Sequence, residues 1–206
     1  MSEETPAFRV VGDVSALPDY AFGPRSILWW GNSAFMMIEG TAFVLAAAAY
    51  LYIRGKGGHW PPPGVRPPDL LWGGLFTAGL LLSELPNRWL QAKTRQFDLA
   101  SVRFGVLVMT LAGLALAGVR AVELSHINVR WGVDAYASCI WLLMVLHTTH
   151  VVTDLGDTAV LCLWMFTHQP GPSQFSDVND NCSYWTFVVV TWIPIGFLIY
   201  LGPRLL

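Results

Sequence analysis

The stretch AYASCIWLLMVLHTTHVVTDLGDTAVLCLWMF, residues 135–166, is apolar enough and long enough to cross a bilayer as one helix. Four ionisable residues interrupt it at spacings of three, four and three: His147, His150, Asp154 and Asp157. In a helix these positions fall on about one quarter of the surface, and we name them the polar stripe. An ionised carboxylate at the bilayer centre costs about 2.5–3.5 kcal/mol. We therefore expect the stripe to be buried and to face other helices, water or a partner subunit.

The composition indicates an integral membrane protein. Hydrophobic residues make up 54% of the 206 positions and charged residues 13%, whereas soluble domains carry about 25% charged residues. The mean hydropathy is +0.48. Four further stretches have the length and apolarity of a membrane span, at 27–53, 70–90, 102–122 and 184–201. The sequence thus predicts an all-α bundle of five transmembrane helices in residues 25–206, after a flexible tail at 1–24.

The remaining bulk features set the orientation and exclude some partners. The densest basic cluster lies between residues 88 and 103, which places the N-terminus in the cytoplasm by the positive-inside rule. The net charge of −2 gives no reason to expect nucleic-acid binding. Cys139, Cys162 and Cys182, the last of them in the loop before the final span, are interpreted as packing residues.

Other polar residues fall within the predicted spans. Glu39 lies near the middle of the first, where its carboxyl must be protonated or hydrogen-bonded, with its partner on another helix. A packing role and a proton-linked role are both open for it. Glu84 can reach the interface beside the basic loop, and Arg120 and Glu123 have the spacing of a local ion pair. Small residues predict close helix contacts in the second and third spans, among them Gly73, Gly74, Gly79, Gly105, Gly113 and Gly118.

Metal or haem binding at the two central histidines is the less favoured interpretation. His147 and His150 could chelate one metal ion with Asp154 or Glu39 as an oxygen ligand. They cannot be the two axial ligands of one haem, because those must approach from opposite faces. Five histidines in the chain are too few for a catalytic oxidase subunit or a membrane desaturase, and both lysines lie in predicted loops, which excludes retinal binding. We predict a hydrogen-bonded packing pair, with no metal, cofactor-binding or catalytic residue on this chain.

Six short motifs together resemble those of one membrane protein family, subunit III of the haem-copper oxidases, and occur in the family's order. They are FMMIEG at 35–40, WPPPG at 60–64, VRAVELSH at 119–126, AYAS at 135–138, LHTTHV at 146–151 and YWTFV at 184–188. These resemble the family's buried glutamate, its proline-rich strap, and its Gln-x-x-Glu, Tyr-Gly-Ser, Leu-His-Gly-Leu-His-Val and Tyr-Trp-His-Phe-Val-Asp segments. The resemblance extends from residue 28 to residue 201. Five helices would correspond to a bacterial short form that lacks the first two of seven.

The resemblance implies an accessory subunit of a cytochrome c oxidase or quinol oxidase complex in the bacterial inner membrane. Such a chain is not catalytic in itself. It would pack against the catalytic subunit I, which with its neighbours holds the haem and copper, bind phospholipid, and support proton uptake and stability during aerobic electron transport. By position, Glu39 would be the family's buried carboxylate, His147 and His150 its paired histidines, and Glu123 its third-helix glutamate.

Some residues depart from the family pattern and keep alternatives open. Thr186 and Val189 replace the family's His and Asp, and Asp154 stands where the family has Gly. The roles of Asp154 and Asp157 are therefore open between a water-filled cavity, an unusual partner and a proton route. The alternatives are a subunit III-like protein associated with nitric oxide reductase, and a small proton- or cation-coupled transport component. The transport component is disfavoured because the sequence lacks the inverted repeats of transporters. A third alternative, a metal-dependent membrane hydrolase, would need a third strong metal ligand near the two histidines.

Overall fold

A computed structural model describes residues 20–56 and 58–205, which form five long helices and no strand. The helices are α1 (Ile27–Gly55), α2 (Leu70–Thr94), α3 (Leu99–His126), α4 (Ala135–Thr167) and α5 (Pro172–Gly196). A short 3-10 turn, η1 (Gly23–Arg25), precedes α1, and α5 continues through a π-helical turn, η2 (Phe197–Leu201), into α6 (Gly202–Leu205). The predicted all-α class is confirmed.

Polar side chains fix where three of the helices begin. The Ser26 hydroxyl accepts hydrogen bonds from the first turn of α1, the Asp98 carboxylate from Ser101 of α3, and the Asp134 carboxylate from Ala137 of α4. Each cap satisfies backbone N–H groups that have no partner inside the helix. Because Asp98 caps α3, that helix begins three residues before the predicted span at 102–122.

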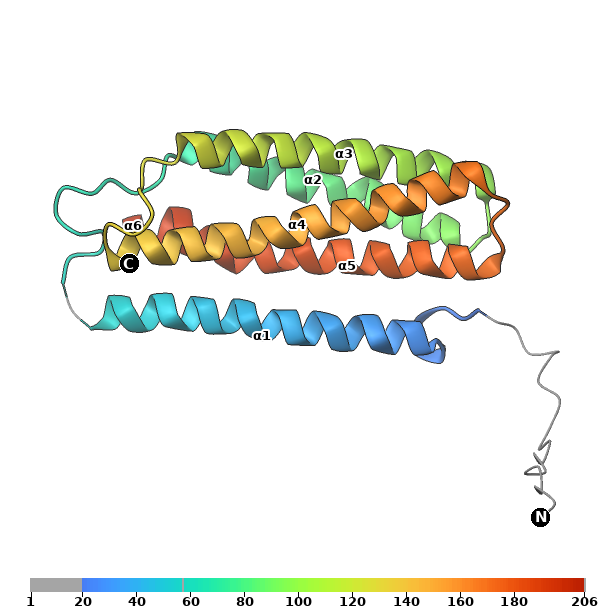
Figure 1. Ribbon diagram of the computed structural model, residues 1–206, viewed down its shortest axis with the longest axis horizontal. Helices are drawn as coiled ribbons and strands as arrows, with labels where there is room; N and C mark the ends of the chain where they lie inside the picture. The colour runs from blue at the N-terminus through green and yellow to red at the C-terminus, as the bar shows by residue number, and fades with distance from the viewer. Residues whose placement is uncertain (1–19, 57, 206) are drawn as a thin grey trace, which may run out of the picture.

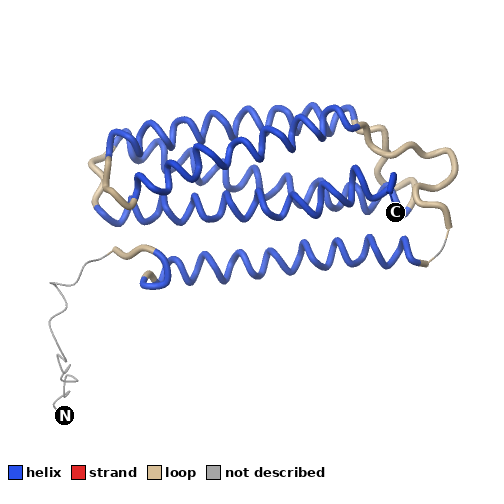
Figure 2. Tube along the Cα trace, turned by 180° about the vertical axis from the view of Figure 1, so that it is seen from behind, coloured by secondary structure: helices blue, strands red, loops and turns tan. Residues whose placement is uncertain are grey.

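Helices α2 to α5 form a four-helix bundle, and α1 lies along one side of it (Figure 1). Sequential helices in the bundle run antiparallel and are joined by loops, and α1 packs against α4 and α5. The reverse view shows the same separation of α1 from the other helices (Figure 2). Only 17% of the most apolar stretch of α1 is buried, against 50% for α4 and α5. Most of α1 therefore faces outward.

Four of the five predicted spans are helices long and apolar enough to cross a membrane. They are α1, α3, α4 and the continuous helix Pro172–Leu205. Helix α2 is of comparable length but polar in its second half, where Ser83, Asn87 and Thr94 are buried against neighbouring helices. That α2 crosses the membrane stays a prediction.

The predicted start of the last helix is wrong by twelve residues. Helix α5 begins at Pro172 rather than 184, so Cys182 is buried within it and not in a loop. The first turns of α5 are polar because they bond to α2: Gln91 donates to the Asn179 carbonyl, Arg95 to the Asn179 side chain and Asn87 to the Cys182 carbonyl. These side chains resemble a loop in the sequence, but they satisfy one another between helices.

The chain before α1 is anchored from Tyr20 onward. The rings of Tyr20 and Phe22 lie 5.4 and 5.7 Å from that of Phe97, in the loop between α2 and α3, and the Ala21 carbonyl accepts a hydrogen bond from Ser176. Residues 20–22, which the sequence assigns to a flexible tail, thus contact the α2–α3 loop and α5. The rest of that tail, residues 1–19, lies outside the described residues.

Candidate functional site

The polar stripe of α4 divides between the bundle interior and its surface. The side chains of His147, Asp154 and His150 are 0%, 1% and 7% exposed, respectively. Asp157, one turn further along, is exposed. The prediction that Asp157 is buried is wrong, because the fourth position of the stripe borders a cavity.

His147 is held as a neutral imidazole between two helices. Its Nε2 lies 3.0 Å from the Val188 carbonyl oxygen, which can only accept, so Nε2 carries the proton. Its Nδ1 lies 3.5 Å from a guanidinium nitrogen of Arg120, which can only donate, so Nδ1 accepts. Both ring nitrogens are thereby used in helix packing.

Arg120 and Glu123 form the predicted ion pair, and it is fully buried. Arg120 Nη1 lies 2.8 Å from Glu123 Oε2, and the two side chains are 1% and 3% exposed. The rings of Phe76 and Trp192 lie 3.5 and 4.2 Å from the Arg120 guanidinium carbon, and Tyr200 donates a hydrogen bond to Glu123. Aromatic faces and the carboxylate together replace the water that this cation has lost.

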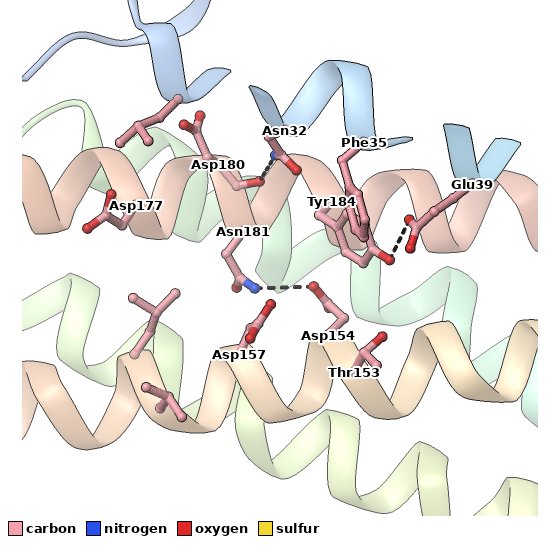
Figure 3. Close-up of a pocket in the computed structure, with 13 residues that line it drawn as sticks. Asn32, Phe35, Glu39, Thr153, Asp154, Asp157, Asp177, Asp180, Asn181 and Tyr184 are labelled. Atoms are coloured by element: carbon pink, nitrogen blue, oxygen red, sulfur yellow. Dashed lines mark hydrogen bonds between the residues drawn. The ribbon is translucent and has the colours of Figure 1, made fainter. Parts of the chain in front are cut away.

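Glu39 finds its partners on two other helices, as predicted. Its Oε1 lies 3.3 Å from His150 Nε2, and Tyr184 donates a hydrogen bond of 2.7 Å to its Oε2 (Figure 3). His150 Nδ1 lies 2.6 Å from the Leu146 carbonyl oxygen and must carry a proton to donate there. The contact between Glu39 and His150 Nε2 therefore requires one further proton, placed either on the carboxyl or on the imidazole. The Glu39–His150 pair shares one proton between α1 and α4.

A cavity of about 690 Å³ opens beside this pair, between α1, α4 and α5. Figure 3 shows its polar residues converging from all three helices. Five acidic residues line it, which are Glu39, Asp154, Asp157, Asp177 and Asp180. We name this space the acidic cavity.

Asp154 is the deepest of these carboxylates. Its Oδ1 accepts a hydrogen bond of 3.2 Å from the Asn181 amide, whose oxygen accepts in turn from Thr158 at 3.1 Å. Its Oδ2 is buried and has no hydrogen-bond partner among the described residues. A buried carboxylate oxygen without a partner is unusual, because the desolvation cost is not offset.

The two central histidines do not converge on a common ion. His147 is turned toward Val188 and Arg120, and His150 toward Leu146 and Glu39. Within residues 20–56 and 58–205, no group of three or more His, Cys, Asp or Glu side chains is arranged to hold a metal ion.

Two residues of the site were not singled out from the sequence. In the sequence, Tyr184 stands out only as part of the YWTFV motif, and Asn181 precedes the predicted last span at 184–201. A helical start at Pro172 would have revealed Asn181, because its spacing from Tyr184 puts both on one face of α5. Glu84 accepts hydrogen bonds from Asn87 and Thr186 and pairs with Arg88, and its expected place near the membrane interface stays a prediction.

Comparison with known proteins supports the family suggested by the motifs. No protein-family model matches the chain. The chain is 28% identical over 182 residues to cytochrome c oxidase subunit 3 of Synechocystis, covering 87% of this chain and 77% of the relative. It is 24% identical to the protein of that name from Thermostichus vulcanus, over 84% and 87% of the two chains.

An animal relative aligns over a shorter part of its length. Cytochrome c oxidase subunit 3 of Gallus gallus is 23% identical over 145 residues, which cover 70% of this chain and 56% of the relative. The agreement of several relatives with the motif order, and with an all-α membrane bundle, leads to one assignment. The resemblance to the subunit III family that the motifs suggest is confirmed by these similarities to proteins named cytochrome c oxidase subunit 3.

Proposed function

We propose that this chain is a non-catalytic, membrane-embedded subunit of a cytochrome c oxidase complex that works in aerobic electron transport. The observation that carries the proposal is the match along 87% of the chain to a relative named cytochrome c oxidase subunit 3. In this proposal the chain packs against subunit I in a bacterial inner membrane, with its N-terminus in the cytoplasm. Haem and copper belong to the partner subunits, and phospholipid contacts the exposed apolar faces.

The Glu39–His150 pair is the element through which this subunit would support proton uptake. Two titratable groups share one proton in a partly buried site, and Tyr184 holds the carboxyl in place. Such a pair can accept or release a proton with little movement of heavy atoms. It borders the acidic cavity, where water can reach it.

A proton- or cation-coupled transport component is not favoured. A relay along the stripe would have to pass through His147, whose two nitrogens are occupied by Val188 and Arg120. A second proton on that imidazole would put a positive charge 3.5 Å from the buried Arg120 guanidinium. Repulsion of this kind is strong in a low-dielectric interior. A proton relay along the stripe would therefore stop at His147.

Purification of the tagged chain from its native membrane tests the assignment. In a mild detergent, we expect a reduced-minus-oxidised spectrum with haem absorbance from copurified subunits. The chain alone should be colourless after those subunits are removed. A chain that purifies without haem-containing partners would overturn the proposal.

The variant Glu39→Gln tests the proton-linked role within the complex. We expect normal assembly, but slower proton uptake or earlier inactivation during turnover, because Gln cannot share the proton with His150. Tyr184→Phe removes one hydrogen bond but keeps the carboxyl, so it should retain most of the function. Asp69→Asn, in the loop before α2, is the matched loss of a carboxylate outside the site. If Glu39→Gln behaves like Asp69→Asn, the carboxyl has only a packing role.

A further inference from the structure

Two arginines line a second cavity, at the end of the bundle where α1 and α3 end and α2 and α4 begin. This cavity has a volume of about 370 Å³ and lies between the loop at 56–69, the loop at 127–134 and the first turn of α4. We name it the arginine pocket, after Arg66 on the first loop and Arg130 on the second. Figure 1 shows the two loops at the same end of the bundle.

Hydrogen bonds hold the backbone of both loops in place around the pocket. The Arg66 carbonyl oxygen accepts a bond of 3.3 Å from the side chain of Asn128, two residues before Arg130. The Val129 carbonyl oxygen accepts a bond of 2.8 Å from Trp141 of α4, which ties the second loop to the bundle. Prolines on both sides of Arg66 restrict the backbone of the first loop further. The places from which the two arginine side chains extend are therefore set before any ligand binds.

The positive charge of the pocket is not neutralised by the part of the chain that the structure describes. Arg66 and Arg130 are both exposed, and neither guanidinium forms an ion pair within residues 20–56 and 58–205. Asp134 is the one acidic residue among the described residues that line the pocket, and its Oδ1 already accepts a bond of 2.7 Å from the Ala137 backbone N–H. Arginine keeps its charge at any physiological pH. Two cations thus face one carboxylate, and a bound anion with a single charge would balance them.

The donors of the pocket fit a phosphate group. A guanidinium presents a planar fork of N–H donors that matches two oxygens of a phosphate. Two such groups on separate loops can contact different oxygens of the same phosphate. The volume of about 370 Å³ is within the usual range of small-molecule sites.

The surroundings of the pocket point to a lipid as the source of that phosphate. Trp131 and Val133, beside Arg130 in the second loop, are 78% and 70% exposed. The helices α1, α3 and α4, which are long and apolar enough to cross a membrane, have their ends at these loops. Exposed Trp side chains are enriched where a membrane meets water. A phosphodiester with acyl chains would contact both the arginines and these apolar side chains, whereas a free phosphate would contact the arginines alone.

We propose that the arginine pocket binds the headgroup of an anionic phospholipid. Arg66 and Arg130 donate hydrogen bonds to its phosphate oxygens, and its acyl chains pass along Trp131 and Val133 into the bilayer. The proposed function includes phospholipid on the exposed apolar faces, whereas this site is polar and selects a lipid by the charge of its headgroup. It requires only that the loops lie at a membrane surface, so it does not depend on the oxidase partners.

Native mass spectrometry tests the proposal by titration of the full-length protein, with its copurified subunits, with phosphatidylglycerol in an uncharged maltoside detergent. Lipids held by the other subunits are the same in every variant, so a difference between variants reports on this pocket. Arg66→Gln and Arg130→Gln should each weaken binding of one lipid about tenfold, the equivalent of one charge-assisted hydrogen bond. The double variant should lose that lipid, and its thermal midpoint without lipid should be unchanged because both arginines are exposed. Lys56→Gln removes an exposed positive charge from the same loop but outside the pocket, and should bind as the unaltered protein does.

Several outcomes would overturn the lipid site. Equal losses in Arg66→Gln and Lys56→Gln would show only non-specific attraction to charge. Equal affinity for phosphatidylcholine, whose headgroup has no net charge, would show that the arginines do not select the lipid. Displacement of the lipid by inorganic phosphate as readily as by phosphatidylglycerol would assign the pocket to a free anion. The haem spectrum of the copurified complex is unaffected by any of these results, so the proposed function is judged separately.

Discussion

At the scale of single residues, the buried polar groups of this chain differ in how completely they are satisfied. Arg120 has a carboxylate, two aromatic faces and the His147 imidazole around it. Asp154 has one amide and an unsatisfied oxygen. The first arrangement joins four helices, α2, α3, α4 and α5, and the second leaves a buried oxygen without a partner among the described residues. Removing a partner of Arg120 should therefore cost folding free energy in a way that removing Asp154 does not.

Glu123→Gln should destabilise the protein strongly. Gln removes the charge opposite Arg120 and leaves a buried cation uncompensated, which costs about 3–5 kcal/mol. The free energy of unfolding in mixed micelles measures the loss. Lys93→Met, which breaks the partly exposed Lys93–Asp98 pair at 3.6 Å, should cost less than about 1 kcal/mol. Similar small losses in both variants would mean that water or a partner solvates Arg120.

Asp98 should make the stability of the α3 start depend on pH. Its carboxylate accepts hydrogen bonds from the Ser101 hydroxyl and backbone N–H, which lower the pKa of Asp98. A lowered pKa stabilises the folded state above the unfolded pKa of about 3.9, and that contribution is lost as the pH falls through the lower folded value. The thermal midpoint of the unaltered protein should thus fall more steeply below about pH 4 than that of Asp98→Asn. Parallel curves would exclude a contribution from this cap.

At the scale of helices, the sequence predicts that a helix is present more accurately than where the helix begins or which of its faces is buried. Apolar length alone predicts α1, α3 and α4 nearly to their bounds, because each is apolar through most of its length. It fails at the start of α5, where Asn179 and Asn181 bond to other helices, since a sequence does not distinguish a polar side chain paired inside a bundle from one in a loop. It likewise cannot tell that Asp157 is exposed while Asp154 is buried, because that depends on which other helices pack around each position.

Gly73 and Gly74 illustrate the same limit and allow a matched test. The sequence predicts close helix contacts at both glycines. A Cβ at Gly73 would overlap the Tyr200 ring, whereas a Cβ at Gly74 would meet no atom within 4 Å. Gly73→Ala should cost about 1–3 kcal/mol and displace Tyr200 from Glu123. Gly74→Ala should be neutral or stabilise α2 by up to about 1 kcal/mol. Equal effects in unfolding measurements would show that η2 moves freely away from α2.

At the scale of the whole molecule, the helix ends gather into two groups. The loop at 95–98 contacts Tyr20 and Phe22 at the start of α1, and Arg103 at the start of α3 donates to the Met165 carbonyl near the end of α4. At the other end, Asn128 in the loop at 127–134 donates to the Arg66 and Pro67 carbonyls of the loop at 56–69. Figure 1 shows these two groups at opposite ends of the bundle. If the bundle axis crosses the membrane, the two groups face opposite compartments.

Thiol labelling in native membranes tests that arrangement, the crossing of α2 and the orientation together. Cys139 and Cys182 are buried, so replacing the partly exposed Cys162 by Ala leaves a low background. His59→Cys and Gln96→Cys each then place one thiol at an exposed position, on either side of α2. The basic cluster at 88–103 predicts that an impermeant maleimide labels position 59 in intact spheroplasts and position 96 only in inverted vesicles. The reverse pattern would place the N-terminus outside the cytoplasm, and labelling of both positions from one side would show that α2 does not cross.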